Sequence, residues 1–163
     1  MTPRPVYADD LPIGRALPLG SAVVTHEEIV DYASQWDPQP IHIDPEAAKA
    51  GHFGDVIASG LHTFAVFNRL ATAAVYTGWQ LVAGRTADVE FVRAVRAGTE
   101  VTGDVTVESV TPYSPRSSTV VKRGELRDAA SGLVLFRMRA TTYMRRNPAS
   151  VAALDTPASA SGS

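Results

Sequence analysis

The stretch of sequence that decides the fold is GLHTFAVFNRLATAAVYTG, residues 60–78. Its apolar side chains recur so closely that a helix here has almost no polar face, and we therefore predict a helix buried in the core. The apolar positions are Leu61, Phe64, Ala65, Phe67, Leu70, Ala71, Ala74 and Val75. Because His62, Asn68 and Arg69 interrupt the run and it is short for a bilayer, a transmembrane span is disfavoured. Gly78 fits the C-terminal cap of this helix.

Beyond this helix the hydrophobic period changes from helical to alternating, which indicates β-strands. The clearest case is TEVTGDVTVESV, residues 99–110, in which Val101, Val105 and Val107 share one face. Four further runs are candidate strands: Ala16 to Val24, Gln80 to Val92, Ser117 to Arg127 and Leu133 to Arg145. One buried helix followed by consecutive strands predicts an α+β fold, in which an antiparallel sheet wraps around a long central helix.

The whole chain has the size and composition of one ordinary domain. It has 163 residues, of which 45% are hydrophobic, and this is enough for a single sizeable core. Residues 147–163 are rich in Pro, Ala and Ser and lack bulky apolar side chains. We therefore predict a single domain over residues 1–146 and a disordered C-terminal tail over residues 147–163.

Charge and cysteine content narrow the range of partners and compartments. The chain has 15 Lys and Arg against 17 Asp and Glu, so its net charge of -2 gives no overall argument for nucleic acid or a membrane surface. It has no cysteine, which removes disulfides, thiolate nucleophiles and cysteine-based metal sites. The first residues, MTPRPVYADDLP, lack the apolar core of a secretory signal. We expect a cytoplasmic protein with no nucleic-acid or membrane partner.

The segment before the buried helix contains capping and proline signals. The S/T-x-x-E form of Thr25 to Glu28 is a capping box, and it predicts a short helix that ends near Trp36. The prolines of DPQPIH, residues 37–42, bias the residues before them towards extended backbone, so we predict an irregular loop. Asp44 before Pro45 predicts the start of a second short helix.

Two side chains of this loop are candidates for acid and base chemistry. Asp37 and His42 lie five positions apart, and they can converge only if the loop turns, because residues of opposite parity in an extended run face opposite sides. The ordinary alternative is an aspartate that ends a helix and a histidine that a backbone carbonyl satisfies. Asp44 needs no catalytic role, because its position as a helix cap already explains it.

Ser59 and Gly60 stand where the buried helix begins. The first amides of a helix lack internal partners and carry the positive end of its dipole, so they suit an oxygen that gains negative charge. Gly60 has no side chain to block the approach of that oxygen. The alternative is that Ser59 only caps the helix and Gly60 only packs, and both interpretations can hold together.

Three other kinds of site lack their sequence patterns. The four histidines recur at intervals of ten and sixteen residues without an HxH or HExxH pair, which disfavours a metal site. The chain contains no GxGxxG or GxxxxGK[ST] motif for a nucleotide and no GxSxG motif for a serine hydrolase.

Taken together, these residues resemble a known signature. The run YASQWDPQPIHIDPEAAKAGHFGDVIASGLHT, residues 32–63, is similar to that of MaoC-like acyl dehydratases and (R)-specific enoyl-CoA hydratases. The shared features are an aspartate, a histidine five residues later, a second aspartate, then FG, I-A and a small residue before glycine. The run FVRAVRAGTEV, residues 91–101, also looks like a strand and glycine turn of this family. The resemblance implies a hot dog fold, assembled as dimers or higher homo-oligomers with sites at or near subunit interfaces.

The resemblance also implies roles for individual residues. Asp37 and His42 would activate water for addition to the β-carbon of a 2-enoyl thioester and exchange the proton at the α-carbon. The backbone N–H of Gly60 would bind the thioester carbonyl, with Ser59 beside it and Thr63 in a supporting role. The chain departs from the family at Gln39, where many hydratases have Asn, and at Ser59, where the better-known ones have His. Both departures flank the expected pocket and bear on substrate choice.

The implied substrate is a thioester of coenzyme A or of acyl carrier protein, with no cofactor besides. Arg85, Arg93 and Arg96 are candidate contacts for the phosphates of coenzyme A, because Arg suits bidentate phosphate binding, although exposed arginines are more often only solvated. Three hypotheses stay open: a hydratase or dehydratase, an acyl-CoA thioesterase on the same fold, and a non-catalytic subunit that binds acyl thioesters.

Overall fold

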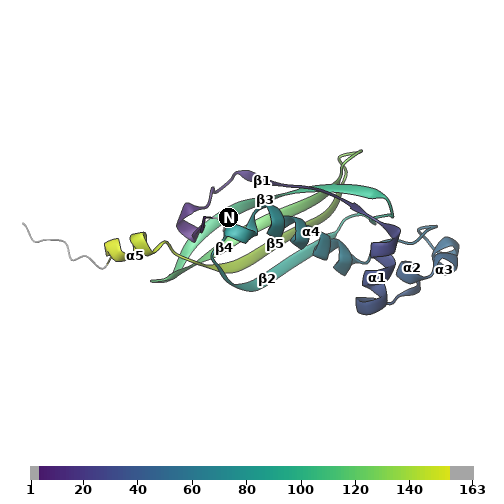
Figure 1. Ribbon diagram of the computed structural model, residues 1–163, viewed down its shortest axis with the longest axis horizontal. Helices are drawn as coiled ribbons and strands as arrows, with labels where there is room; N and C mark the ends of the chain where they lie inside the picture. The colour runs from purple at the N-terminus through teal and green to yellow at the C-terminus, as the bar shows by residue number, and fades with distance from the viewer. Residues whose placement is uncertain (1–3, 155–163) are drawn as a thin grey trace, which may run out of the picture.

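A computed structural model describes residues 4–154 as one antiparallel sheet with a long helix against it (Figure 1). The five strands lie in the order β1-β3-β4-β5-β2, and every neighbouring pair is antiparallel. The strands are β1 (Ala16–Val24), β2 (Leu81–Phe91), β3 (Thr99–Ser114), β4 (Ser117–Asp128) and β5 (Val134–Arg145). The predicted α+β class is confirmed, and all five predicted strands are present, with ends close to the predicted ones.

The long helix α4 (Gly60–Ala74) is the fold-deciding stretch. Phe67 is fully buried against the sheet and packs on Phe136 of β5, at 5.5 Å between ring centroids. The prediction of a helix with almost no exposed face is wrong, because only one side of α4 is buried. Asn68 and Arg69 are exposed, and Leu61 exposes 52% of its surface.

The predicted cap at Gly78 is wrong. The helix ends at Ala74 with Val75 as its C-cap, and residues Tyr76–Gly78 form a separate 3-10 turn, η2. The hydroxyl of Thr77 donates to the carbonyl of Thr72 at 2.5 Å, which satisfies one of the last helical carbonyls without a glycine. A tighter last turn of this kind is common at helix ends.

The segment before α4 folds largely as its capping signals predict. Helix α1 (His26–Trp36) has the predicted capping box, because the Glu28 N–H donates to Thr25 Oγ1 at 3.1 Å and the Thr25 N–H to Glu28 Oε2 at 3.2 Å. Helix α3 (Pro45–Ala50) begins at Asp44, whose Oδ1 accepts from two backbone amides.

The irregular loop predicted over residues 37–42 is wrong in its second half. Residues Pro40–Ile43 form a one-turn helix, α2, in which Pro40 is the first residue. The fixed φ of proline suits this position, and its missing N–H would have no helical partner there. Gln39 before it is extended, as predicted.

Two short helices lie near the ends of the described chain. The 3-10 helix η1 (Ala8–Asp10) precedes β1, and helix α5 (Pro148–Leu154) follows β5. Residues 148–154 of the predicted disordered tail are therefore helical, whereas residues 155–163 lie outside the described residues, and for them the prediction stays a prediction. Within residues 4–154, no helix has the length and apolar character needed to cross a membrane.

Gly124 of β4 sets how closely α4 lies on the sheet. A Cβ at Gly124 would lie 2.2 Å from Cζ of Phe67, so any larger residue would push the helix away. We predict that Gly124→Ala lowers the free energy of unfolding by about 1–3 kcal/mol, as overpacked cores do. Urea denaturation measures this change.

Two further variants control this test. Gly84→Ala places a Cβ in open space and is expected to leave stability nearly unchanged. Phe67→Leu replaces the ring that lies over Gly124 with a smaller side chain. The double variant Gly124→Ala with Phe67→Leu should therefore lose less stability than the sum of the two single losses. Additive losses would show that the contact with Phe67 is not the cause.

Candidate active site

The loop candidates and the start of α4 meet at one end of the molecule. Asp37 directly follows α1, His42 lies in α2, and Ser59 precedes the first turn of α4, at the end where Figure 1 places α1, α2 and α3. Tyr32 of α1 stacks on His62 of α4, at 4.7 Å between ring centroids and 11° between planes. This stack holds the end of α1 against the first turn of α4.

Asp37 and His42 converge, as the sequence required of a working pair. His42 Nε2 lies 3.7 Å from Asp37 Oδ2. The one-turn helix α2 supplies the necessary turn, because the His42 N–H donates to the Gln39 carbonyl at 2.9 Å and the Gln39 N–H to the Asp37 carbonyl at 2.8 Å. A separation of 3.7 Å is too long for a direct hydrogen bond, and it suits two groups that share one water.

The ring of His42 is held in one orientation. Its Nδ1 lies 2.7 Å from the carbonyl oxygen of Ile57, and the residue exposes only 5% of its surface. Because a carbonyl can only accept, Nδ1 carries a proton and donates it. In the neutral ring Nε2 is then the unprotonated nitrogen, and it faces Asp37. The ordinary interpretation of a histidine bound to a backbone carbonyl therefore holds, and it leaves the second nitrogen available.

Two side chains fix the carboxylate of Asp37. Ser59 Oγ donates to Asp37 Oδ2 at 2.5 Å, and Gln39 Nε2 donates to Asp37 Oδ1 at 2.7 Å. These bonds, that from Ser59 first, hold the pKa of Asp37 below its usual value. Asp37 is therefore ionised at neutral pH and acts as an acceptor rather than as an acid.

Ser59 has two functions at once. Its Oγ accepts from the Leu61 N–H at 3.2 Å, which caps α4, and donates to Asp37. The sequence predicted the cap but not the bond to Asp37, which lies 22 positions away. No local pattern in the sequence signals that contact. The hydroxyl of Thr63 donates to the Ser59 carbonyl at 3.2 Å, so it supports the first turn of the helix.

Gly60 lies under an aromatic ring. A Cβ at Gly60 would lie 2.8 Å from Cε2 and Cζ of Phe91, so the packing interpretation of this glycine holds. As the first residue of α4, Gly60 also has an N–H without a partner in the preceding turn, so the oxyanion interpretation stays a prediction. Phe91 ends β2 and is half exposed, and sequence reasoning did not select it as a site residue.

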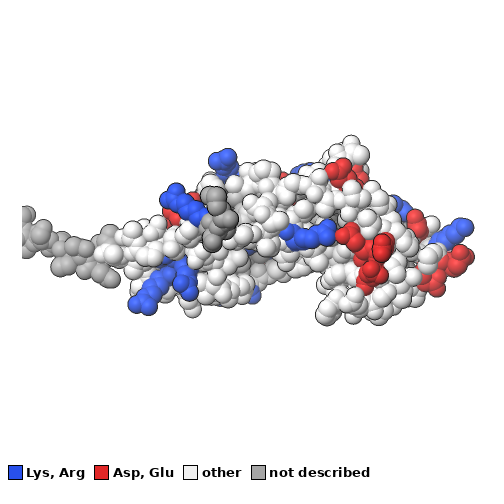
Figure 2. All heavy atoms as spheres, viewed as in Figure 1, with Lys and Arg blue, Asp and Glu red and all other residues white. Residues whose placement is uncertain are grey.

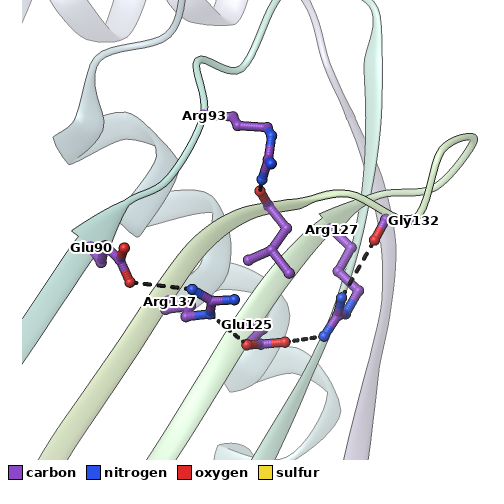
Figure 3. Close-up of polar contacts among 7 residues, drawn as sticks. Glu90, Arg93, Glu125, Arg127, Gly132 and Arg137 are labelled. Atoms are coloured by element: carbon purple, nitrogen blue, oxygen red, sulfur yellow. Dashed lines mark hydrogen bonds and ion pairs between the residues drawn. The ribbon is translucent and has the colours of Figure 1, made fainter.

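The structure does not gather the three candidate arginines into one cluster. Arg85 lies in the middle of β2, with its guanidinium carbon 5.8 Å from the ring centroid of Tyr143. Arg93 follows β2, and its Nη1 donates to the Val134 carbonyl at 2.7 Å (Figure 3). Only Arg96 lies beside the site, because its backbone bridges to Ile57. Contacts with coenzyme A stay a prediction for all three.

In the described part of the chain, no three His, Asp or Glu side chains form a group that could hold a metal ion. What the site offers is an ionised carboxylate, an imidazole with a free nitrogen, and a helix N-terminus next to them. This is a set of groups for moving a proton and stabilising an anion.

Comparison with known proteins agrees with this set of groups. Residues 12–129 match the family model described as MaoC like domain. The uncharacterized protein YdeM of Bacillus subtilis is 34% identical over 76 residues, which cover 47% of this chain and about half, 54%, of that protein. A UPF0336 protein of Streptomyces avermitilis is 33% identical over 125 residues, 72% of this chain and 83% of that protein.

Solved structures show the same architecture. The MaoC-like dehydratase from Rhodospirillum rubrum superposes with a TM-score of 0.78 and 29% identity, over 88% of this chain and 99% of that one. The R-hydratase PhaJ1 from Pseudomonas aeruginosa superposes with a TM-score of 0.69 and 18% identity, over 89% of this chain and 88% of that one. The predicted hot dog fold is confirmed.

The hydrogen bonds from Ser59 and Gln39 should determine how far the pKa of Asp37 is lowered. Ser59→Ala and Gln39→Ala each remove one donor, so each should raise the pKa of Asp37, and Ser59→Ala should raise it more. Since the carboxylate form exists above the pKa, a higher pKa moves the acid limb of any Asp37-dependent rate to higher pH. A carbon-13 NMR titration of the carboxyl measures the pKa directly.

Stability separates the two variants. Ser59→Ala also removes the cap of α4 and should cost about 1 kcal/mol of unfolding free energy. Gln39 is exposed, and its replacement should change stability by no more than about 0.5 kcal/mol. An Asp37 pKa that stays at its wild-type value in both variants would contradict the assigned cause.

Proposed function

The chain belongs to the MaoC-like domain family, and from that premise we propose that it hydrates or dehydrates acyl thioesters, converting 2-enoyl-CoA to (R)-3-hydroxyacyl-CoA or the reverse. The observation that carries the proposal is the 3.7 Å gap between His42 Nε2 and Asp37 Oδ2, next to the N-terminus of α4. The likeness to the MaoC-like dehydratase of Rhodospirillum rubrum, at 29% identity, supports the same reaction class.

In this mechanism one water lies between the two side chains. His42 Nε2 takes a proton from the water, and the resulting hydroxide adds to the β-carbon of the enoyl group. The electron pair of the double bond moves towards the thioester oxygen, which becomes an enolate near the Gly60 N–H. The imidazolium, stabilised by the Asp37 carboxylate, then returns the proton to the α-carbon. Water is added overall, and the reverse order removes it.

Each side chain has a physical reason for its role. The Ile57 carbonyl keeps the proton of His42 on Nδ1, so the basic nitrogen faces the water. Ser59 and Gln39 keep Asp37 charged, so it can stabilise the imidazolium and orient the water. The N-terminus of α4 places positive dipole where the enolate oxygen forms.

The substrate we propose is a coenzyme A or acyl carrier protein thioester, with no further cofactor. A role in fatty acid metabolism would follow from this chemistry. We propose the cytoplasm as the compartment, because a chain of 163 residues without cysteine needs no oxidising environment.

Substitution of the pair tests the chemistry. Asp37→Asn and His42→Ala should each lower kcat for hydration of a short 2-enoyl-CoA by roughly a hundredfold to ten-thousandfold, the range for a lost acid or base. The rate is followed as the loss of the enoyl-thioester absorbance. Asp44→Asn is the matched control, because asparagine also caps α3 and should keep the wild-type rate.

A second readout separates the alternative reactions. Release of free thiol from acyl-CoA, detected with a thiol reagent, would identify a thioesterase instead. Tight binding of CoA esters without turnover on a broad panel would identify a binding subunit. Wild-type hydration rates in both Asp37→Asn and His42→Ala would contradict the proposed roles.

We also propose that two copies associate through β2. All eleven residues of this edge strand are exposed, including Leu81, Val82, Val89 and Phe91 at 40% to 57% exposure. A long uncovered edge with apolar side chains invites pairing with another chain. A two-fold axis through the strand would pair it with its own copy antiparallel, and the two sheets would become one. The exposed side of α4 would offer further surface for this contact between the two copies.

A lysine on this edge should weaken the dimer. Val89→Lys places a charge in the proposed interface, and we expect the mass measured by light scattering after size exclusion to fall from that of a dimer towards that of a monomer. Ile13→Lys is the control, because Ile13 is also exposed, at 59%, but lies away from β2. A monomeric wild type, or equal dissociation in both variants, would contradict pairing through β2.

A further inference from the structure

Three arginines line a cavity at the end of the molecule opposite Asp37. The cavity has a volume of about 660 Å³, and its walls come from the start of β2, the turn from β3 to β4, the end of β5 and α5. Figure 1 places α5 at the opposite end of the molecule from α1, α2 and α3. Its charged walls are Arg116, Arg145 and Arg146, and Val82, Pro148 and Val151 are among its apolar walls. We call this cavity the arginine pocket.

The backbone holds the arginines of the pocket in place. The Arg146 N–H donates to the Arg116 carbonyl at 3.0 Å, which ties the end of β5 to the turn before β4. The turn itself is fixed by Ser114, whose Oγ lies 2.7 Å from Ser117 Oγ and accepts from the Arg116 N–H at 3.3 Å. The backbone segments that carry Arg116 and Arg146 are therefore joined to each other by hydrogen bonds.

Arg146 is a nearly buried cation with little compensation. Its side chain is 14% exposed, and its one ion pair with the described residues joins Nε to Asp9 Oδ1 at 3.5 Å. Nε makes no hydrogen bond with the described residues. Asp9 is shared, because its other oxygen accepts from the Asn147 N–H at 2.7 Å. A guanidinium has five donors, so this one has most of its capacity unused.

The other two arginines have no acidic partner at all in the described part of the chain, since neither Arg116 nor Arg145 lies within ion-pair distance of a carboxylate there. By contrast, three arginines of β4 and β5 outside the pocket have acidic partners. Arg127 and Arg137 both bind Glu125, as Figure 3 shows, and Arg139 binds Glu108. The pocket therefore concentrates unneutralised positive charge in a chain whose net charge is -2.

Acidic and basic side chains also mostly lie at opposite ends of the molecular surface. On the face in Figure 2 the acidic side chains gather around α1 and α3, whereas the charged side chains near α5 are mostly basic. Guanidinium groups suit phosphate, which they can bind with paired hydrogen bonds. The apolar walls of the pocket would contact the organic part of a ligand that carries the phosphate groups.

We infer that the arginine pocket is a binding site for an organic phosphate, with the phosphate groups on Arg116, Arg145 and Arg146 and the organic part on Pro148 and Val151. This site is separate from the catalytic pair of the same chain. Phe91, which covers Gly60, pairs with Phe136, and Arg145 lies nine residues farther along β5. At about 3.3 Å per residue this is roughly 30 Å, beyond the reach of a pantetheine arm.

Binding without turnover tests the inference independently of the proposed function. Calorimetric titration of the full chain with coenzyme A and with ADP should show binding, whereas pantetheine, which has no phosphate, should not bind at this site. Arg116→Gln and Arg145→Gln should each weaken binding of both phosphate probes roughly tenfold or more, the usual effect of losing a charged hydrogen bond. Both side chains are exposed, so neither substitution is expected to disturb folding.

The matched control is Arg123→Gln, which removes an exposed arginine of β4 outside the pocket and should leave the affinities unchanged. Binding should also weaken as salt rises. If neither probe binds below millimolar concentration, or if Arg123→Gln weakens binding as much as the pocket variants, the inference is overturned.

The same variants identify the source of the phosphate. If the ligand is the coenzyme A end of a thioester seated at the catalytic pair of a second copy, Arg145→Gln raises KM for the acyl-CoA and leaves acyl-pantetheine unaffected. If the ligand is an independent organic phosphate, KM stays unchanged while ADP affinity falls. Either result supports a phosphate site in the arginine pocket.

Discussion

The close contact between Phe67 and Gly124 is the constraint on which the rest of the structure depends. Because no side chain can stand between the ring and β4, α4 lies directly on the sheet, and its position and direction are fixed. A helix held in this way has a defined first turn, and the first turn carries Ser59 and Gly60. Dense packing of α4 on the sheet thus fixes where Ser59 and Gly60 lie, because side chains in a close-packed interior have little room to shift.

Ser59 connects the packed helix α4 to Asp37. Its hydroxyl caps α4 and binds the carboxylate of Asp37, and His62 in the same turn stacks on Tyr32 of α1. Burial lowers the pKa of His62, so this ring is neutral at neutral pH and packs as an aromatic group. The end of α1 is thereby attached twice to the start of α4, and Asp37 has little freedom to leave His42.

The sequence predicted what depends on local patterns and missed what depends on distant contacts. Capping residues at Thr25 and Asp44 located α1 and α3, because a cap needs only its own first turn. The same reasoning misplaced the end of α4 at Gly78, where the hydroxyl of Thr77 serves instead of a glycine. The bonds from His42 to Ile57 and from Ser59 to Asp37 join residues 15 and 22 positions apart, which no periodicity reveals.

The two departures from the better-known hydratase pattern have a shared consequence in the structure. Gln39 and Ser59 stand at different points of the sequence, yet both donate to Asp37, one to each oxygen. A carboxylate held by two donors is more stable in its charged form, so a proton resides less readily on Asp37 than on a carboxylate with one donor. The Nε2 of His42 faces this carboxylate, since Nδ1 is engaged with the Ile57 carbonyl. In the proposed mechanism this leaves the proton transfers to His42 and gives Asp37 the role of a fixed negative charge beside it.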